Sequence, residues 1–410
     1  MDSESVKRGF MSSIDILLEN NQFASDEKLS VTEIPNETFQ TEISIGGVEV
    51  IEKIFDEWIE LCEEGACNEP FFRPEWFVAF VKNFEKEILL LTVRRAGKLR
   101  AVLPLMKGNG NLHGVPVKSL EAVYNLNTQR FDLIRGADES ERKEIVKAVW
   151  KEIKGQPKWR VLEMRLVKKD SWLNDLLALA ESENYRTGVW QMDAAPFIEL
   201  PQGDNKEKLI EDFFKGSRKH QRQELNRRLR RLKELGEVEF VVTRGYSPEL
   251  MQTYFELEAK GWKGRGGTAV TDDERVSKLH HDFARAIAAK NALFIYQLKL
   301  NGKTIAMSAN IIYAKQAVHW KTSYDEEYSR YSPGNLLFRE FLSDCIRKDL
   351  SEIDFLSPAA AYKKFWASGE REHAAYYVFQ PGVLGSLLWN WKFSVISRLR
   401  KYKKAINTQS

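Results

Sequence analysis

The chain has 410 residues, of which 43% are apolar and 30% are charged. Such a length and composition predict a globular protein of two or three domains and exclude a disordered chain, a collagen or a coiled coil. The net charge of +3 conceals an asymmetry, because residues 1–65 carry sixteen acidic and four basic side chains and the remainder is strongly basic. A basic body attracts phosphorylated cofactors, nucleic acid or anionic lipid, and charge alone does not distinguish these partners.

The cysteines and the termini narrow the class further. Cys62, Cys67 and Cys345 are too few, and odd in number, for a disulfide framework, which favours a reducing compartment. No second Cys or His pair follows Cys62 and Cys67 at finger-like spacing, so no metal site is predicted. We expect neither a signal peptide nor a membrane-spanning helix, because the longest uncharged run, 374–391, is broken at Pro381. These features predict a cytoplasmic protein.

The first half of the chain predicts alternating helices and strands. Residues 1–40 are acidic and poorly periodic, which predicts a flexible tail. Apolar residues from 48 to 61 recur at helical spacing, and a second helix is predicted after Pro74. Strands at 87–93 and 99–105 flank a hairpin turn. Four further elements are predicted in this half, namely strands at 119–123 and 159–165 and helices at 139–154 and 171–183.

The same pattern returns about 205 residues later along the chain. Superposing Gly97-Lys98 on Gly302-Lys303 aligns a strand, a turn and a strand in both places, and a helix precedes each. The agreement of the flanking elements predicts a duplicated α/β domain with mixed sheets. The predicted organisation is a tail at 1–40, one domain at 41–195, a second at 196–385 and a basic amphipathic helix at 386–410.

The most basic stretch, 217–234, lies early in the second half. It has eight Lys or Arg against two Glu, with Leu225, Leu229 and Leu232 at helical spacing and Ser217 as a possible N-cap. Two interpretations are open: a helix docked by its leucines with a solvated basic face, or an electrostatic platform for phosphate groups. The chain has no zinc finger or RNA-binding motif that would indicate recognition of a specific duplex.

The segment 317–347 carries the clearest chemical signal. Val318, Trp320 and Thr322 alternate as in a strand, and Ser332-Pro333-Gly334 then opens a helix with Ser at the N-cap and Pro at the first helical position. The first turn of a helix has N–H groups without partners, which bind anions such as phosphate. An ordinary strand–helix junction has the same sequence features, so the segment alone leaves both interpretations open.

Two further clusters suggest chemistry. A strand at 352–356 precedes Tyr362, whose lysine neighbours Lys363 and Lys364 would lower its pKa and suit it to protonate a leaving thiolate. The alternative is that Tyr362 and Trp366 pack a loop onto the core. Earlier, a helix containing Glu258 ends before a basic, glycine-rich loop at 262–268, which either approaches a ligand or is a connecting turn. The chain has no P-loop, dinucleotide loop or nucleophile elbow.

Four blocks in this order resemble the GNAT-superfamily acyltransferases of the cellulose-biosynthesis-associated CelD/BcsL type, which are related to the FemAB aminoacyl transferases. The resemblance spans about residues 70–370, and the first half adds Arg73-Pro74-Glu75-Trp76 and the Gly97-Lys98 hairpin. The blocks are Ser217-Arg218-Lys219, Trp262-Lys263-Gly264-Arg265, Tyr324-Asp325 through Tyr331-Ser332-Pro333-Gly334, and Asp354-Phe355 followed by Tyr362-Lys363 and Trp366.

This resemblance implies two tandem GNAT-like domains, each a mixed sheet flanked by helices. It implies acyl-CoA as co-substrate, with no permanently bound cofactor, and a primary amine as acceptor, expected on an amino sugar of an exopolysaccharide or cell-envelope precursor. The implied residues are Arg330, Tyr331, Ser332, Gly334 and Asn335 for the pyrophosphate, Tyr362 as acid, Asp325 or Glu258 as base, and Trp262, Lys263, Arg265, Lys363 and Trp366 around the substrates.

One departure from the family pattern keeps alternatives open. The usual loop, [Q/R]-x-x-G-x-[G/A], is represented by residues 330–335 with a single glycine displaced by one position. FemAB relatives use aminoacyl-tRNA, which the helix at 217–234 would also suit, and no other nucleic acid is expected as a partner. A non-catalytic module of a polysaccharide-synthesis complex is the third hypothesis.

The C-terminal segment has its own pattern. Basic residues accompany an apolar stripe at helical spacing, which predicts either a helix on an anionic membrane surface or one that closes over the first domain. The first interpretation would make the protein peripheral at the inner face of the membrane. The stripe consists of Leu384, Leu387, Leu388, Trp391, Val395, Leu399 and Tyr402.

Overall fold

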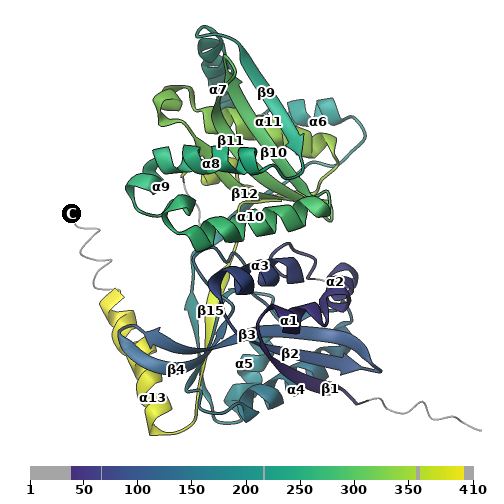
Figure 1. The fold of residues 1–410 in the computed structure, drawn as a ribbon, viewed down its shortest axis with the longest axis vertical. Coiled ribbons are helices and arrows are strands. Elements are labelled where there is room, and N and C mark those ends of the chain that lie inside the picture. The colour runs from purple at the N-terminus through teal and green to yellow at the C-terminus, as the bar shows by residue number, and fades with distance from the viewer. Residues whose placement is uncertain (1–37, 66, 216–217, 357–360, 401–410) are drawn as a thin grey trace, which may run out of the picture. The chain divides into compact units, whose positions relative to one another are not determined.

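The computed structural model describes residues 38–65, 67–215, 218–356 and 361–400, with the backbone alone for Trp262, Lys263 and Ala361. The chain from Phe39 onward forms one compact unit (Figure 1). The predicted tail at 1–40 falls almost entirely outside the described residues, as do Ser217 and Tyr402. No helix within the described ranges has the length and apolar character needed to cross a bilayer.

Within the described residues, the first sheet contains eight strands in the order β1-β2-β3-β4-β6-β15-β7, with β5 paired to β3. Neighbouring strands are antiparallel except β4 and β6, which run parallel. The strands are β1 (Gln40–Gly46), β2 (Ile88–Arg95), β3 (Lys98–Leu112), β4 (Val115–Ala122), β5 (Ile134–Arg135), β6 (Val161–Lys168), β7 (Arg186–Gln191) and β15 (His373–Phe379).

The second sheet, over the same described ranges, contains seven strands in the order β14-β8-β13-β12-β11-β10-β9. Its one parallel pair is β12 with β13. The strands are β8 (Ala195–Glu199), β9 (Val238–Arg244), β10 (Leu293–Leu300), β11 (Lys303–Tyr313), β12 (Gln316–Tyr324), β13 (Glu352–Asp354) and β14 (Gly369–Arg371).

The two sheets repeat one topology. In each, four antiparallel strands lead to a parallel pair, β4 with β6 in the first and β12 with β13 in the second. The equivalent hairpins β2–β3 and β10–β11 turn at Ala96-Gly97 and Asn301-Gly302, all four residues having φ between 49° and 77°. Two successive positive φ values define the type I′ turn that matches strand twist, so the glycines are required there. The predicted duplication of a mixed α/β domain is confirmed.

The two repeats, β1–β8 and β9–β15, each contribute their last strand to the sheet of the other repeat. β15, from the end of the second half, lies between β6 and β7 of the first sheet, and β8, which follows β7, lies between β13 and β14 of the second sheet. The predicted division at 195 and 385 therefore differs from the observed sheets, because residues 373–379 complete the first sheet. Sequence periodicity identifies strands but carries no information on which sheet a strand joins.

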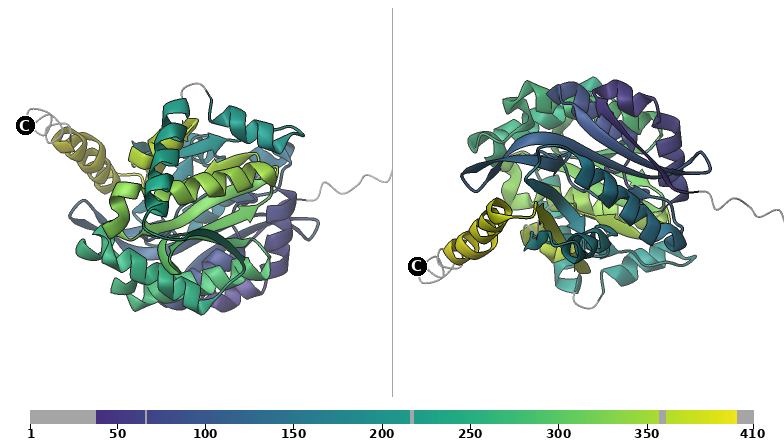
Figure 2. Two further views of the ribbon diagram at one scale, coloured as in Figure 1. Left: turned by 90° about the horizontal axis from the view of Figure 1, so that it is seen from above. Right: turned by 90° about the horizontal axis from the view of Figure 1, so that it is seen from below.

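Helices cover both faces of each sheet (Figures 1 and 2). In the first sheet this explains the unbroken apolar run of β2, because Ile88 and Leu90 face one core while Leu89 and Leu91 face the other. The predicted helix at 48–61 is in fact two helices, α1 and α2. The helices of the first half are α1 (Val48–Glu52), α2 (Phe55–Glu64), α3 (Pro74–Phe84), α4 (Arg142–Gly155) and α5 (Leu173–Ser182).

In the second half, α8 and α10 pack on the face toward α3, and α6, α7 and α11 pack on the opposite face (Figure 1). The helices are α6 (Lys206–Phe213), α7 (Lys219–Lys233), α8 (Pro248–Lys260), α9 (Trp262–Arg265), α10 (Glu274–Ala289), the short 3₁₀ segments η3 (Val270–Asp272) and η4 (Glu326–Tyr331), α11 (Pro333–Arg347), α12 (Ala361–Trp366) and, at the end of the described chain, α13 (Val383–Asn390) and the π-helical η5 (Trp391–Ile396).

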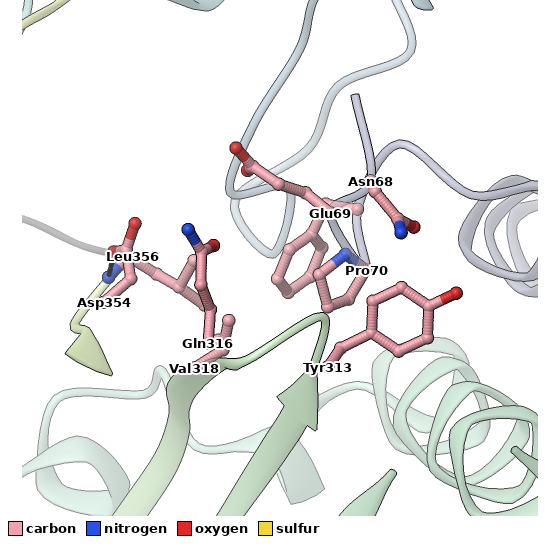
Figure 3. Close-up of a pocket in the computed structure, with 9 residues that line it drawn as sticks. Asn68, Glu69, Pro70, Tyr313, Gln316, Val318, Asp354 and Leu356 are labelled. Atoms are coloured by element: carbon pink, nitrogen blue, oxygen red, sulfur yellow. Dashed lines mark hydrogen bonds between the residues drawn. The ribbon is translucent and has the colours of Figure 1, made fainter. Parts of the chain in front are cut away.

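The halves share a core and a buried ion pair. Trp76 of α3 packs edge-on against Phe283 of α10, with ring centroids 5.1 Å apart. Arg130, from the loop after β4, donates to both carboxylate oxygens of Asp354 at the end of β13, at 2.9 and 2.7 Å. Beside this pair, a hollow of about 10 Å³ lies between Pro70 and Tyr313, large enough for about one water molecule (Figure 3).

Candidate functional site

The second sheet opens between its two parallel strands. Among the described residues, β13 pairs with β12 only where Gln316–Val318 meets Glu352–Asp354. From His319 to Tyr324, β12 continues without this neighbour, and a cavity of about 960 Å³ lies beside it. This volume is within the range of small-molecule and cofactor sites. We call it the central cavity.

Four parts of the chain line the central cavity. They are the second half of β12, the start of α11, the loop and helix ends around α8 and α12, and a loop of the first half. The lining includes Leu126, Asn127 and Gln129 from the first half, Glu258, Gly267–Val270, Asp272 and Asp273 after α8, His319–Tyr324 from β12, Ser332, Gly334, Asn335 and Phe338 at α11, and Leu356, Tyr362 and Lys363.

The first turn of α11 faces the central cavity through Gly334 and Asn335. Pro333 is the first helical residue, as expected, and a Pro at this position loses no hydrogen bond because the first N–H groups of a helix have no intrahelical partner. The N–H groups of Gly334 and Asn335 belong to this turn. Their position makes the start of α11 suited to an anion.

The expected capping role of Ser332 is wrong in its detail. Ser332 occupies the N-cap position, but its φ of 49° is left-handed and its side chain makes no cap. A capping side chain requires an extended backbone at that position. The Ser332 hydroxyl instead accepts a hydrogen bond from Arg228 of α7. The basic helix is thereby tied directly to the start of α11.

Glu258 is a buried acid that lines the central cavity. It lies near the end of α8 and is 3% exposed. One carboxylate oxygen accepts from the hydroxyl of Tyr254 at 2.8 Å, and the other accepts from the N–H of Val270 at 2.9 Å. Donors on both oxygens fix the orientation of the carboxylate.

Asp325, the other predicted base, does not line the central cavity. Its carboxylate accepts from Lys303 at 2.8 Å and from the N–H of Glu327 at 3.2 Å. Burial alone would raise the pKa of Asp325, but Lys303 and the Glu327 N–H hold it below its usual range. The Asp325 side chain caps the start of η4 and lies outside the cavity lining. The geometry therefore favours Glu258 over Asp325 as the base.

Tyr362 and Lys363 both line the central cavity from α12. Burial raises the pKa of Tyr362 well above its usual range. The expectation that the lysines lower it is wrong, because Lys363 donates to the carbonyl of Phe355 at 3.2 Å and its Nζ is 6.0 Å from the centroid of the Tyr362 ring. Tyr362 is therefore a phenol that stays protonated.

His319 is a cavity residue that the sequence did not single out. Its Nδ1 is 2.7 Å from Oδ1 of Asn310, whose amide donates to Ser308 at 3.0 Å. An amide oxygen only accepts, so Nδ1 carries the proton and Nε2 has a free lone pair. Burial, with a smaller effect of Lys363, lowers the pKa of His319 to about 3. Nε2 makes no hydrogen bond within the described residues.

Two other predicted residues lie in the surrounding structure. Trp366 is fully buried and donates from Nε1 to Oδ1 of Asn335 at 3.0 Å, so it positions the start of α11. Arg265 is exposed and pairs with Glu326, which lines the central cavity. Gly264 is required by packing, because a Cβ there would be 1.8 Å from the carbonyl oxygen of Ala259. The structure describes only the backbone of Trp262 and Lys263.

Arg330 and Tyr331 are not among the lining residues of the central cavity. Arg330 is exposed, with its guanidinium 4.7 Å from the centroid of the Tyr331 ring. Tyr331 is 7% exposed and belongs to the core of the second half. Of the predicted loop, the geometry thus brings Ser332, Gly334 and Asn335 to the cavity. No group of three His, Cys, Asp or Glu within the described residues could hold a metal ion.

Comparisons with known proteins concern the fold of the chain. Residues 219–364 match a family model described as an acetyltransferase (GNAT) domain. No curated protein matches the chain. The structure of FemX is similar at 12% identity, covering 85% of this chain and 99% of that one, with a TM-score of 0.56.

Two other solved structures are also similar. The C-terminal DUF2156 domain of a putative lysylphosphatidylglycerol synthetase from Agrobacterium fabrum is 14% identical, covering 82% of this chain and 94% of that one, with a TM-score of 0.50. A tandem GNAT protein from the clavulanic acid biosynthesis pathway is 11% identical, covering 84% and 100%, with a TM-score of 0.44. The fold is two tandem GNAT-like domains, each a mixed sheet flanked by helices.

Proposed function

We propose that this protein transfers an acyl group from acyl-CoA to a primary amine in the central cavity. The observation that carries the proposal is the convergence of three features on one cavity: the opening between β12 and β13, the first turn of α11, and the buried carboxylate of Glu258. Such a cavity would hold the acyl donor, through its anionic phosphate groups, beside the amine acceptor, as acyl transfer requires.

The donor would enter along the open edge of β12. An extended amide-containing chain, such as the pantetheine arm of CoA, can pair with a strand edge that has no neighbour. Its pyrophosphate would then bind the N–H groups of Gly334 and Asn335, with Arg228 supplying positive charge beside Ser332. Lys363, which lines the same cavity from α12, would add a second cation.

Glu258 would hold the acceptor ammonium and take its proton. The neutral amine then attacks the thioester carbonyl, forming a C–N bond as the C–S bond breaks, and the proton that the nitrogen loses as the amide forms replaces the one that Tyr362 gives to the thiolate. The protonated phenol of Tyr362 would supply a proton to the departing thiolate. Nε2 of His319, an acceptor that lines the same cavity, would accept a hydrogen bond from the incoming amine and orient its lone pair.

For the acceptor we propose an amino sugar of an exopolysaccharide or cell-envelope precursor. The resemblance to the CelD/BcsL type names this class. The first-half wall supports it with Asn127 and Gln129, whose amides can bond to sugar hydroxyls, and Trp320 offers an aromatic face.

A FemAB-like transfer from aminoacyl-tRNA is the second candidate. Arg228 ties α7 to the start of α11, so the basic face of this helix continues from the proposed phosphate site. A long polyanion such as tRNA would contact the whole basic face of α7, whereas acyl-CoA would contact only the part of it near the start of α11. The exposed basic residues of α7 are Lys219, Arg222, Arg227, Arg230, Arg231 and Lys233.

Calorimetric titration with acetyl-CoA and longer acyl-CoAs, at two salt concentrations, tests the donor. The matched variants are Gly334→Glu and Gly334→Ala. A Cβ at Gly334 would only touch Tyr324, at 3.4 Å, so alanine should fold and bind normally. The glutamate places a negative charge at the proposed phosphate site and should weaken binding by at least about tenfold.

Micromolar binding lost only in Gly334→Glu would support acyl-CoA as the donor and justify a screen of amino-sugar acceptors. A folded protein that binds no acyl-CoA would overturn the leading proposal. Binding of charged tRNA, falling steeply with salt, would then favour the FemAB-like alternative. Unchanged activity in cells with Tyr362→Phe and Glu258→Gln would indicate a non-catalytic module.

A further inference from the structure

The C-terminal helix has two different faces. On one side Leu388 is 6% exposed and Trp391 donates from Nε1 to the carbonyl of Leu112 at 2.9 Å, which fastens the helix to the first half. On the other side five apolar side chains remain in solvent. They are Val383, Leu384, Leu387, Val395 and Leu399, with exposures of 79, 49, 60, 42 and 58%.

A π-helical turn brings the exposed residues into line. The turn at Trp391–Ile396 takes one residue more than an α-helical turn. Val395 follows Leu387 by eight positions, and Leu399 follows it by twelve. Because of the extra residue in the π-helical turn, these separations are equivalent to about seven and eleven positions in an uninterrupted α-helix. Those are spacings of a single face. The predicted stripe is thus corrected, because Leu388 and Trp391 turn to the protein.

Positive charge accompanies this exposed face. The chain has no acidic residue after Glu372. Of the six Lys and Arg residues that follow Glu372, five lie between positions 398 and 404. Arg398 is exposed at the end of the described helix, and Arg400, also exposed, has its guanidinium 5.2 Å from the centroid of the Trp190 ring. Lys392 is instead buried, with Nζ 4.2 Å from the centroid of the Trp190 ring, so it anchors the helix.

We propose that the exposed face of residues 383–399, with the positive charge at the end of this helix, docks this protein on the surface of an anionic lipid bilayer. An apolar stripe that lies in the interface, with cations toward the headgroups, is the physical signature of such a helix. Each Lys or Arg near an anionic surface adds electrostatic attraction that weakens as salt is raised.

The charge pattern favours a bilayer over a second copy of the chain. Two copies facing each other through this helix would bring like charges together, because the segment after Glu372 contains only basic ionised residues. An anionic bilayer complements both the charge and the apolar stripe. The proposal does not depend on which donor or acceptor the central cavity takes.

Co-sedimentation of the full chain with vesicles tests the proposal. Vesicles of phosphatidylcholine alone are compared with an equal mixture of phosphatidylcholine and phosphatidylglycerol. Leu387→Gln/Leu399→Gln removes the centre of the stripe, and Ile45→Gln/Leu235→Gln changes two apolar residues that are 51 and 44% exposed elsewhere. Circular dichroism and thermal unfolding check that both variants fold.

We expect the wild-type chain to bind mixed vesicles, more weakly at high salt, and the stripe variant to bind at least about tenfold less tightly. The control variant should bind as the wild type does. Equal binding by the two variants would overturn the proposal, as would a wild type that binds neither vesicle. A dimer abolished by Leu387→Gln/Leu399→Gln, without vesicle binding, would show that a second copy covers the face instead.

Discussion

Replacing Arg130 by methionine should destabilise the whole unit. The Arg130 side chain is fully buried, and besides Asp354 it donates to the carbonyls of Leu356 and Gln129, at 2.9 and 3.0 Å. Asp354 also accepts from Arg371 at 2.9 Å and from the N–H of Leu356 at 2.6 Å. Methionine fills similar space without charge, so it leaves the buried carboxylate with Arg371 as its remaining cation.

Removing one partner of a buried ion pair typically costs about 3–5 kcal/mol of unfolding free energy. Arg371 retains part of the interaction with Asp354, so we expect the lower end, about 3 kcal/mol. Burial favours the neutral acid, but Arg130, the Leu356 N–H and Arg371 hold the pKa of Asp354 below its usual range. The contribution of the pair is therefore complete above about pH 4, the unfolded pKa, and is lost as the pH falls through the folded pKa.

Urea unfolding of the wild type, Arg130→Met and a control, Lys147→Ala, measures the effect. Lys147 belongs to an exposed pair with Glu144 on α4, so its removal should leave stability unchanged within error. The difference between the wild type and Arg130→Met should shrink as the pH is lowered toward about 3. A loss below about 1 kcal/mol at neutral pH would refute the reasoning, because the pair would then behave like a surface pair.

Three further predictions follow from single contacts. Glu258→Gln should lower turnover by at least about a hundredfold, with thermal unfolding unchanged, and full activity would exclude Glu258 as the base. Burial lowers the pKa of Lys392 to about 8. Stability should therefore rise between about pH 8 and pH 10 through this group, and a wild-type rise that persists in Lys392→Met would exclude it as the source. A Cβ at Gly188 would be 2.2 Å from the ring of Phe393, so Gly188→Val should loosen η5 from β7 and speed its proteolysis, whereas Gly155→Ala, where a Cβ would meet nothing within 4 Å, should not.

The sequence predicted the repeated core of the fold because its signals are local. The hairpin turns at Ala96-Gly97 and Asn301-Gly302 and the apolar strands beside them are specified by neighbouring residues. The start of α11 was predictable for the same reason, since Pro333 at the first helical position is a local signal. Glu258, Tyr362 and Lys363, which belong to two clusters that the sequence singled out and that the resemblance gave roles, do line one cavity.

What the sequence did not reveal depends on contacts between distant segments. The exchange of β8 and β15 between sheets leaves no periodic signal, because each strand is equally apolar in either place. His319 is one of six scattered histidines until Asn310 and the opening beside β12 orient it. The π-helical turn after α13 likewise departs from the regular spacing on which helical stripes are predicted.

The parallel pairs of the two sheets differ in how much of the longer strand they cover. In the first sheet β4 pairs with β6 from Ser119 to Glu121, and β4 then ends at Ala122. In the second sheet β12 pairs with β13 only up to Val318 and continues to Tyr324, which leaves six residues beside an opening. The loop that follows β4 fills a different role, since its residues line the cavity of the second half and its Arg130 fastens them to Asp354. The first half therefore acts as a wall of the site, and the reciprocal exchange of strands keeps that wall in place. Separating the halves at residue 195 should abolish the site even if each fragment were soluble.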